Sequence, residues 1–85
     1  MYYTYVLFSL KDKQMYTGYT QDLKNRFKQH ISGKVKSTEN RLPVKLIYYE
    51  ACLNQQDATR REKYLKSGNG KIYLKNRLRE FWNQA

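Results

Sequence analysis

The first twenty residues constrain the fold of this chain more than any other feature. They read MYYTYVLFSLKDKQMYTGYT, and two runs within them, residues 3–8 and 15–19, are rich in aromatic and β-branched side chains. Such side chains favour strands, and the polar segment 11–14 between the runs favours a turn. The sequence therefore predicts an antiparallel hairpin at the start of the chain.

A helix is expected to follow the hairpin over residues 21–31. Three apolar side chains recur in it at i, i+4 and i+8, the spacing of a buried stripe: Leu23, Phe27 and Ile31. Thr20 is a suitable N-cap, and Gly33 suits the left-handed conformation in which many helices end. The pattern predicts an amphipathic helix with a defined start and a defined end.

The second half of the chain predicts one more strand and two more helices. Residues 44–50, VKLIYYE, have strand composition, and Asn54 is expected to cap a helix that ends near Lys66. Gly68-Asn69-Gly70 would stop that helix, and a last helix would cover residues 71–82. The predicted fold class is α+β: a small three-stranded antiparallel sheet flanked by helices in the order ββαβαα.

Size and charge limit the classes of function. A chain of 85 residues suffices for a single domain, 1–85, with a modest core. Seventeen Lys and Arg against seven Asp and Glu give a net charge of +10, which favours a polyanionic partner, nucleic acid first. No apolar run is long enough to span a membrane, and the N-terminus lacks the basic segment of a signal peptide. We therefore expect a cytoplasmic monomer without a membrane partner.

The single cysteine, Cys52, excludes an internal disulfide. Together with a single histidine it also excludes a zinc site built from Cys and His alone. Cys52 lies between Ala51 and Leu53 after a strand-like run, so a small buried side chain is the favoured interpretation.

Two polar residues border the apolar stripe of the first expected helix. Arg26 and His30 are four residues apart and therefore share a face. At 100° per residue, His30 lies about 20° from Leu23 and Arg26 about 60° from it. Both side chains are placed to meet a partner at the edge of the core. An Arg lying along the sheet and a hydrogen-bonded His would explain the pattern equally well.

A carboxylate interrupts the apolar stripe of the second expected helix. Ala58, Glu62 and Leu65 follow at i, i+4 and i+7, a spacing that faces a core. A buried charge is costly unless it is paired or bound to a metal. Lys66, four residues on, is one candidate partner, and a hard cation such as Mg²⁺, which needs only one or two carboxylates, is the other. The spacing alone leaves both open.

The tyrosines of the hairpin could be packing groups or reagents. Tyr16 and Gly18 lie two residues apart on an expected strand and therefore share a face. A free tyrosine has a pKa of about 10, but surrounding cations would lower the pKa and let a phenolate take a proton from water. Gly18 would let substrate approach closely. Strand tyrosines more commonly serve as packing groups, so the sequence leaves both roles open.

Taken in order, these residues resemble the motifs of the GIY-YIG nucleases. Tyr5-Val6-Leu7 and Tyr16-Thr17-Gly18 resemble the paired motifs of the family, although only the tyrosine of the first one matches. Arg26, His30 and Glu62 follow in the family's order. The segment TRREKYLKSGNGKIYLKNRL looks like the small stand-alone, excision-repair-endonuclease-like members, and the similarity extends over nearly the whole chain.

The resemblance implies a metal-dependent endonuclease that hydrolyses phosphodiester bonds of nucleic acid, with DNA of particular structure as the expected substrate. Tyr5 and Tyr16 would flank the attacking water, and Tyr16 is the preferred general base. Arg26 would hold the scissile phosphate, and His30 would assist proton transfer or phosphate binding. Glu62 would be the one protein ligand of a Mg²⁺ or Mn²⁺ ion acting as Lewis acid.

Further residues are expected to contact nucleic acid: Gly18, Tyr19, Lys34, Lys36 and Arg41. Tyr19 stands where some repair relatives have a lysine. Asn69 and Asn76 are both candidates for the asparagine that some members use after the metal-binding glutamate. We expect no added DNA-reading domain, so specificity would come from a protein partner or from DNA shape.

Two other functions fit the sequence. A non-catalytic nucleic-acid-binding domain that keeps the nuclease fold would explain the net charge and the basic run Lys34, Lys36 and Arg41. A protein-interaction module would dock through Phe81 and Trp82, but burial of this pair on the sheet is favoured.

Overall fold

The structure is a computed structural model that describes residues 1–84. Its sheet consists of three antiparallel strands: β1 (Tyr2–Ser9), β2 (Met15–Thr20) and β3 (Val44–Cys52). The strand order is β2-β1-β3, so β1 is central and β2 and β3 are edges. The predicted hairpin and the predicted third strand are confirmed.

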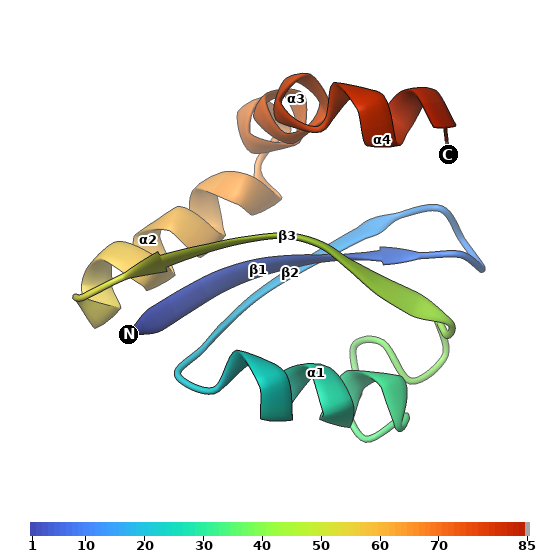
Figure 1. The fold of residues 1–85 in the computed structure, drawn as a ribbon, viewed down its shortest axis with the longest axis horizontal. Coiled ribbons are helices and arrows are strands. Elements are labelled where there is room, and N and C mark those ends of the chain that lie inside the picture. The colour runs from blue at the N-terminus through green and yellow to red at the C-terminus, as the bar shows by residue number, and fades with distance from the viewer. Residues whose placement is uncertain (85) are drawn as a thin grey trace.

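Four helices cover the two faces of this sheet: α1 (Leu23–Ile31), α2 (Gln55–Lys66), α3 (Gly68–Arg77) and α4 (Arg79–Gln84). In Figure 1, α1 lies on one side of the sheet, and α2, α3 and α4 lie on the other. The α+β class is confirmed, with the order ββαβααα instead of ββαβαα. No helix within residues 1–84 has the length and apolar character needed to cross a membrane.

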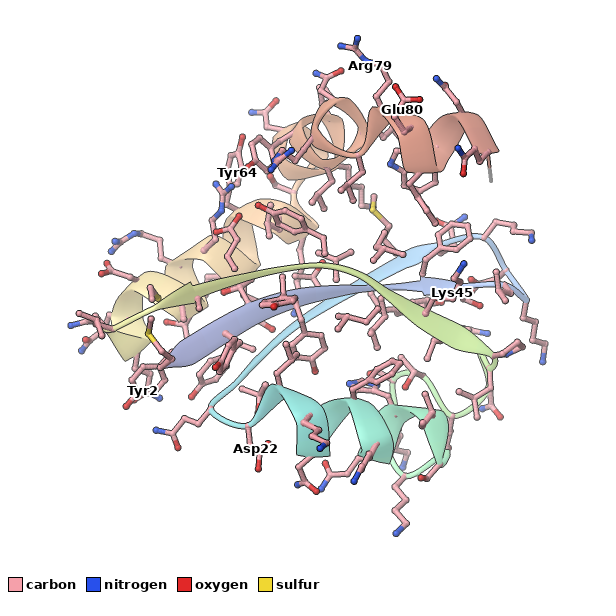
Figure 2. All side chains as sticks on the ribbon, viewed as in Figure 1. Tyr2, Asp22, Lys45, Tyr64, Arg79 and Glu80 are labelled. Atoms are coloured by element: carbon pink, nitrogen blue, oxygen red, sulfur yellow. The ribbon has the colours of Figure 1, made fainter. Side chains whose placement is uncertain are left out.

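The central strand β1 is buried on both faces, and its alternating side chains enter two separate cores. Tyr5 and Leu7 belong to the core on the α1 side. Val6 belongs to the opposite core, with Leu65 of α2 and Leu74 of α3. Figure 2 shows side chains filling the space between the sheet and the helices on both sides. This two-sided burial explains why the first strand reads as a nearly continuous apolar run.

The start of α1 differs from the prediction. Asp22, and not Thr20, is the N-cap, because its side chain accepts a hydrogen bond from the amide of Asn25 at 3.1 Å. The Thr20 hydroxyl instead accepts from the Asp22 amide at 3.1 Å and holds the turn that leads into the helix. A carboxylate at the N-cap also interacts favourably with the helix dipole.

The buried face of α1 is also rotated relative to the prediction. Leu23 and Phe27 pack on the core as expected, but Ile31 is 50 % exposed and His30 is only 3 % exposed. His30 finds buried hydrogen-bond partners, which offset the cost of burying its ring. Gly33 follows the helix with φ of +74°, so its predicted left-handed role is confirmed.

The C-terminal helices divide at other positions than predicted. Ser67 ends α2 and caps α3, and Gly68 is already the first residue of α3. A Cβ at Gly70 would lie 2.0 Å from the Tyr64 carbonyl oxygen, so glycine is required for the close approach of α3 to α2. A second break at Leu78 splits the predicted helix 71–82 into α3 and α4.

The aromatic pair near the C-terminus packs on the sheet. The rings of Phe81 and Trp82 lie 5.2 Å and 5.4 Å from the ring of Phe8, in edge-to-face geometry. Arg79 and Glu80 point away from the sheet on the outer side (Figure 2). This arrangement agrees with the predicted burial of the pair and gives no support to docking through it.

Candidate active site

A polar hollow of about 210 Å³ lies over the edge strand β2, where α1 and α2 from opposite faces both reach. It brings together five residues predicted to be catalytic: Tyr5, Tyr16, Arg26, His30 and Glu62. These side chains come from β1, β2, α1 and α2, and the sequence separates the first from the last by more than half of the chain. Tertiary folding therefore assembles the cluster.

The predicted nucleic-acid contacts divide into two groups. Gly18 and Tyr19 line the polar hollow, whereas Lys34, Lys36 and Arg41 do not. The two lysines are exposed on the loop between α1 and β3. The phenol of Tyr19 accepts a hydrogen bond from Gln55 at 2.6 Å, which links β2 to the start of α2.

Tyr5 is held by a short chain of buried hydrogen bonds. Its hydroxyl lies 2.8 Å from Nε2 of His30, and Nδ1 of the same ring lies 2.7 Å from the hydroxyl of Thr38. Burial lowers the pKa of His30, and the Arg26 guanidinium adds to this, so the imidazole is neutral near pH 7. A neutral imidazole donates through one nitrogen and accepts through the other, which matches its two hydroxyl partners.

Gly18 makes room for the phenol of Tyr5, and the predicted close approach of substrate to Gly18 stays a prediction. The two residues lie opposite each other in the β1–β2 ladder. A Cβ at Gly18 would lie 2.5 Å from the Tyr5 hydroxyl oxygen and 2.6 Å from the ring carbon that bears it. Glycine is therefore required here by the position of the phenol.

Three charged side chains surround the buried phenol of Tyr5. Burial raises the pKa of Tyr5, and this outweighs the lowering by Arg26 and Lys66, while Glu62 raises the pKa further. The prediction that cations would lower the pKa of this tyrosine is wrong, because Tyr5 is only 4 % exposed and desolvation dominates. Tyr5 is therefore protonated at neutral pH.

Tyr16 has a different partner from Tyr5. Its hydroxyl donates a short hydrogen bond to the carboxylate of Asp12, in the turn of the same hairpin. That bond raises the pKa of Tyr16 and lowers the pKa of Asp12. The predicted lowering by cations is wrong for Tyr16 too, although Arg41 is nearby, with Nε 3.3 Å from an Asp12 oxygen. Arg41 thus contacts the site indirectly, through Asp12.

Glu62 is paired in the structure with Lys66, one of the two partners considered from the sequence. The Lys66 ammonium lies 3.1 Å from Oε2 of Glu62, whose side chain is 21 % exposed. Arg26 donates to the side-chain oxygen of Gln29 at 2.9 Å, within the same helix. The hollow therefore holds two cations and one carboxylate, which leaves a positive surplus for an anionic ligand.

The site offers a metal ion a single carboxylate ligand. Residues 1–84 contain no group of three or more His, Cys, Asp or Glu side chains that could hold a metal. Mg²⁺ is often held by one or two carboxylates together with waters and substrate phosphates. Glu62, partly exposed at the rim, fits an ion whose coordination is completed by the substrate.

Several residues of the site were not singled out from the sequence. Asp12 and Thr38 lie in segments that read as polar turn and loop, and the sequence gives no signal that they support Tyr16 and His30. Thr38 is fully buried although its neighbours are polar. Ser37 lines the hollow from the same loop. Loop residues reach the site only because the chain folds back between α1 and β3.

Comparison with known proteins agrees with this geometry. The model of the GIY-YIG catalytic domain matches residues 1–79. A UPF0213 protein of Clostridium perfringens is 45 % identical over 77 residues, which cover 87 % of this chain and 82 % of the relative. No solved structure gives a significant match.

Other relatives carry the same family designation. A UPF0213 protein of Streptococcus agalactiae is 49 % identical over 65 residues, 75 % of this chain and 73 % of the relative. Another, from Pediococcus acidilactici, is 43 % identical over 81 residues, 88 % of this chain and 82 % of the relative. GIY-YIG domains are the catalytic domains of a family of endonucleases. On the match over residues 1–79 and these relatives, the chain belongs to the GIY-YIG catalytic domain family.

Proposed function

We propose that this protein is a metal-dependent endonuclease that hydrolyses phosphodiester bonds of nucleic acid, with DNA of particular structure as the substrate. One observation carries the proposal: two tyrosines, an arginine, a histidine and a glutamate from four separate elements converge on one hollow. Packing alone does not require this combination, and the surplus of positive charge in the hollow favours an anionic ligand.

In the proposed mechanism, Arg26 binds the scissile phosphate. A guanidinium presents paired donors to phosphate oxygens, and it offsets the charge that develops on them during attack. The bond to Gln29 holds the guanidinium at the hollow. Glu62 would hold the Mg²⁺ or Mn²⁺ ion, which, when bound, supplies Lewis-acid stabilisation of the leaving oxygen.

Tyr16 is the proposed general base, as preferred from the sequence. It is partly exposed, whereas Tyr5 is buried, so water reaches the hydroxyl of Tyr16 more readily. The phenol proton of Tyr16 already points at the Asp12 carboxylate. As Tyr16 takes a proton from the attacking water, its own proton can pass to Asp12, so no free phenolate is needed. Tyr5, fixed by His30, orients the water from the other side.

Cleavage assays test this proposal. The purified protein is incubated with flapped, branched, nicked and single-stranded DNA, and with RNA, in Mg²⁺ or Mn²⁺. We expect cleavage of at least one substrate and its loss in Glu62→Ala, with Glu39→Ala, an exposed carboxylate of the α1–β3 loop, as the matched control. Cleavage that persists unchanged in Glu62→Ala would overturn the assignment.

A non-catalytic nucleic-acid-binding domain is the second candidate function. The ion pair between Lys66 and Glu62 favours it, because the lysine occupies the carboxylate that would bind the metal. In this case the net charge of +10 would serve binding alone. Salt-dependent binding without cleavage of any substrate in either metal would support this second function over the first.

A further inference from the structure

A second hollow of about 330 Å³ adjoins the polar hollow. The two hollows share four lining residues: Tyr16, Thr17, Ser37 and Lys66. Lys71, in the first turn of α3, lines the second hollow but not the polar hollow. The joint between α2 and α3 therefore extends the proposed catalytic site along a continuous surface.

The side chains of the second hollow favour an anionic occupant. Lys71 supplies one ammonium group and Lys66 supplies a second, which is paired with Glu62 of the polar hollow. Thr17 and Ser37 supply hydroxyls. No Asp or Glu belongs to its lining among the described residues. Lys71 is exposed and forms no ion pair within residues 1–84.

A third hollow, between α1 and β3, provides the contrast. It is larger, about 630 Å³, and its lining is mainly apolar, with Phe27, Ile31 and Leu46. It also includes the carboxylate of Asp22 and shares no residue with the polar hollow. Unlike this third hollow, the second hollow continues the polar hollow and has no carboxylate in its lining.

We infer that the second hollow binds the phosphate next to the scissile one in the same nucleic-acid strand, with Lys71 as the principal contact. This inference rests on the proposed function, in which Arg26 holds the scissile phosphate. A strand that leaves the polar hollow over Thr17 and Ser37 reaches Lys71 through the second hollow, whose lining has no carboxylate. A lysine ammonium serves as a point charge for a phosphate of either DNA or RNA.

Binding as a function of salt concentration tests the inference. Three variants are compared. Lys71→Gln removes the exposed charge of Lys71, and Lys71→Arg keeps it. The control Lys24→Gln removes an exposed charge that lines only the third hollow. Fluorescence anisotropy is recorded with labelled single-stranded and duplex DNA, with EDTA present to prevent cleavage. Thermal unfolding of each variant verifies that it is folded.

We expect Lys71→Gln to reduce the slope of log Kobs against log salt by about 0.9 on duplex and about 0.7 on single strands, the value for one phosphate. Affinity would fall roughly fivefold at moderate salt. Lys71→Arg should keep the wild-type slope. In cleavage assays Lys71→Gln should raise KM and leave kcat unchanged, because the contact is the same in ground and transition states.

Two results would count against the inference, and they are distinguishable. If the wild type binds and cleaves, but Lys71→Gln and Lys24→Gln have equal slopes, the phosphate does not lie at Lys71, and the proposed function is untouched. If the wild type neither binds nor cleaves nucleic acid, the proposed function fails, and the inference fails with it.

Discussion

Two polar clusters meet at α2, and they differ in how completely their charges are matched. At β3, Arg61 donates to the carboxylate of Glu50 through Nε at 3.0 Å and Nη2 at 2.9 Å. Its guanidinium also stacks over the ring of Tyr73, 4.6 Å from the centroid. Tyr48 donates to the same carboxylate at 2.7 Å. This β3 cluster satisfies itself and ties α2 to the sheet.

Glu62, the next residue along α2, is also paired, with Lys66 at 3.1 Å, but its surroundings hold one more cation than carboxylate. Glu62 lies in the polar hollow, where the side-chain partner of Arg26 is the neutral amide of Gln29. Lys66 adds a second positive charge to that of Arg26. The fully matched β3 cluster holds the helix in place, whereas the surplus positive charge of the polar hollow is available to a ligand.

Exchanging each arginine for lysine is the strongest way to break this comparison. Arg26→Lys should reduce cleavage by about a thousandfold, because an ammonium cannot present a planar fork to phosphate. Arg61→Lys should instead lower the free energy of unfolding by about 1 kcal/mol through the lost paired hydrogen bonds. Cleavage rates and urea unfolding of both variants measure the two effects. Equal losses of activity in two folded variants would show that the clusters do not differ in role.

Each cluster contains a tyrosine that donates a hydrogen bond to a carboxylate: Tyr16 at the polar hollow and Tyr48 in the β3 cluster. Tyr16→Phe should reduce cleavage by about a hundredfold, the usual contribution of a general base. Tyr48→Phe, which removes the matching hydroxyl from the β3 cluster, should leave cleavage nearly unchanged. Single-turnover cleavage rates compare the two, with circular dichroism to verify folding. A fully active Tyr16→Phe would remove this residue from the role of base.

The pH dependence of stability sharpens the description of the polar hollow. The pKa of His30 is lowered in the folded protein by burial and by Arg26, so the unfolded chain takes up a proton first. The free energy of unfolding should therefore be constant above about pH 6.5 and fall as the pH drops towards the lower folded pKa, by at most about 1.4 kcal/mol per pH unit. Urea unfolding at a series of pH values measures this.

The protein has a single histidine, so replacing His30 removes every imidazole and serves as the control. His30→Gln should lose the part of the slope that lies just below pH 6.5 while it keeps the steeper loss caused by carboxylates at lower pH. An unchanged slope in His30→Gln would mean that another group titrates there.

The smallest expected effect is a shift in the pKa of Tyr16 on replacement of Asp12, which is measured separately from the loss of cleavage that the proposed proton path to Asp12 implies. The hydrogen bond from Tyr16 to Asp12 raises the pKa of the phenol, so Asp12→Asn should lower the pKa of Tyr16 towards its usual value. The Asp12 side chain is 27 % exposed, and asparagine can keep the hydrogen bonds from Tyr16 and the Gln14 amide, so the free energy of unfolding at neutral pH should change little. Ultraviolet difference titration of the tyrosines follows the shift, with Asp57→Asn on α2 as the control. A Tyr16 pKa that does not move would exclude Asp12 as its partner in solution.

Much of the fold was predictable because it depends on local patterns. Strand composition and period located all three strands, and periodic apolar residues located α1 and α2. The wrong helix boundaries concern residues whose contacts in the folded protein oppose their local sequence preferences. Gly68-Asn69-Gly70 looks like a helix stop. In the structure, Gly70 instead allows the close approach of α3 to α2, and the break between the two helices lies at Ser67.

The candidate site was predictable in its members but not in their chemistry. Arg26, His30 and Glu62 stand out because polar groups at the border of an apolar stripe are unusual. The direction of the tyrosine pKa shifts could not be predicted, because net charge says nothing about which group lies nearest. Asp12 and burial, and not the abundant cations, set the pKa values of Tyr16 and Tyr5.

Periodicity and composition along the chain were enough to predict the α+β class, the hairpin and the residue types available for chemistry. Which of those residues meet depends on how the strands and helices pack. Tyr5 contacts His30 across 25 positions, and Thr38 completes the chain from a loop. Hydrogen bonds and desolvation act over a few ångströms in space, so distance along the sequence cannot reveal them.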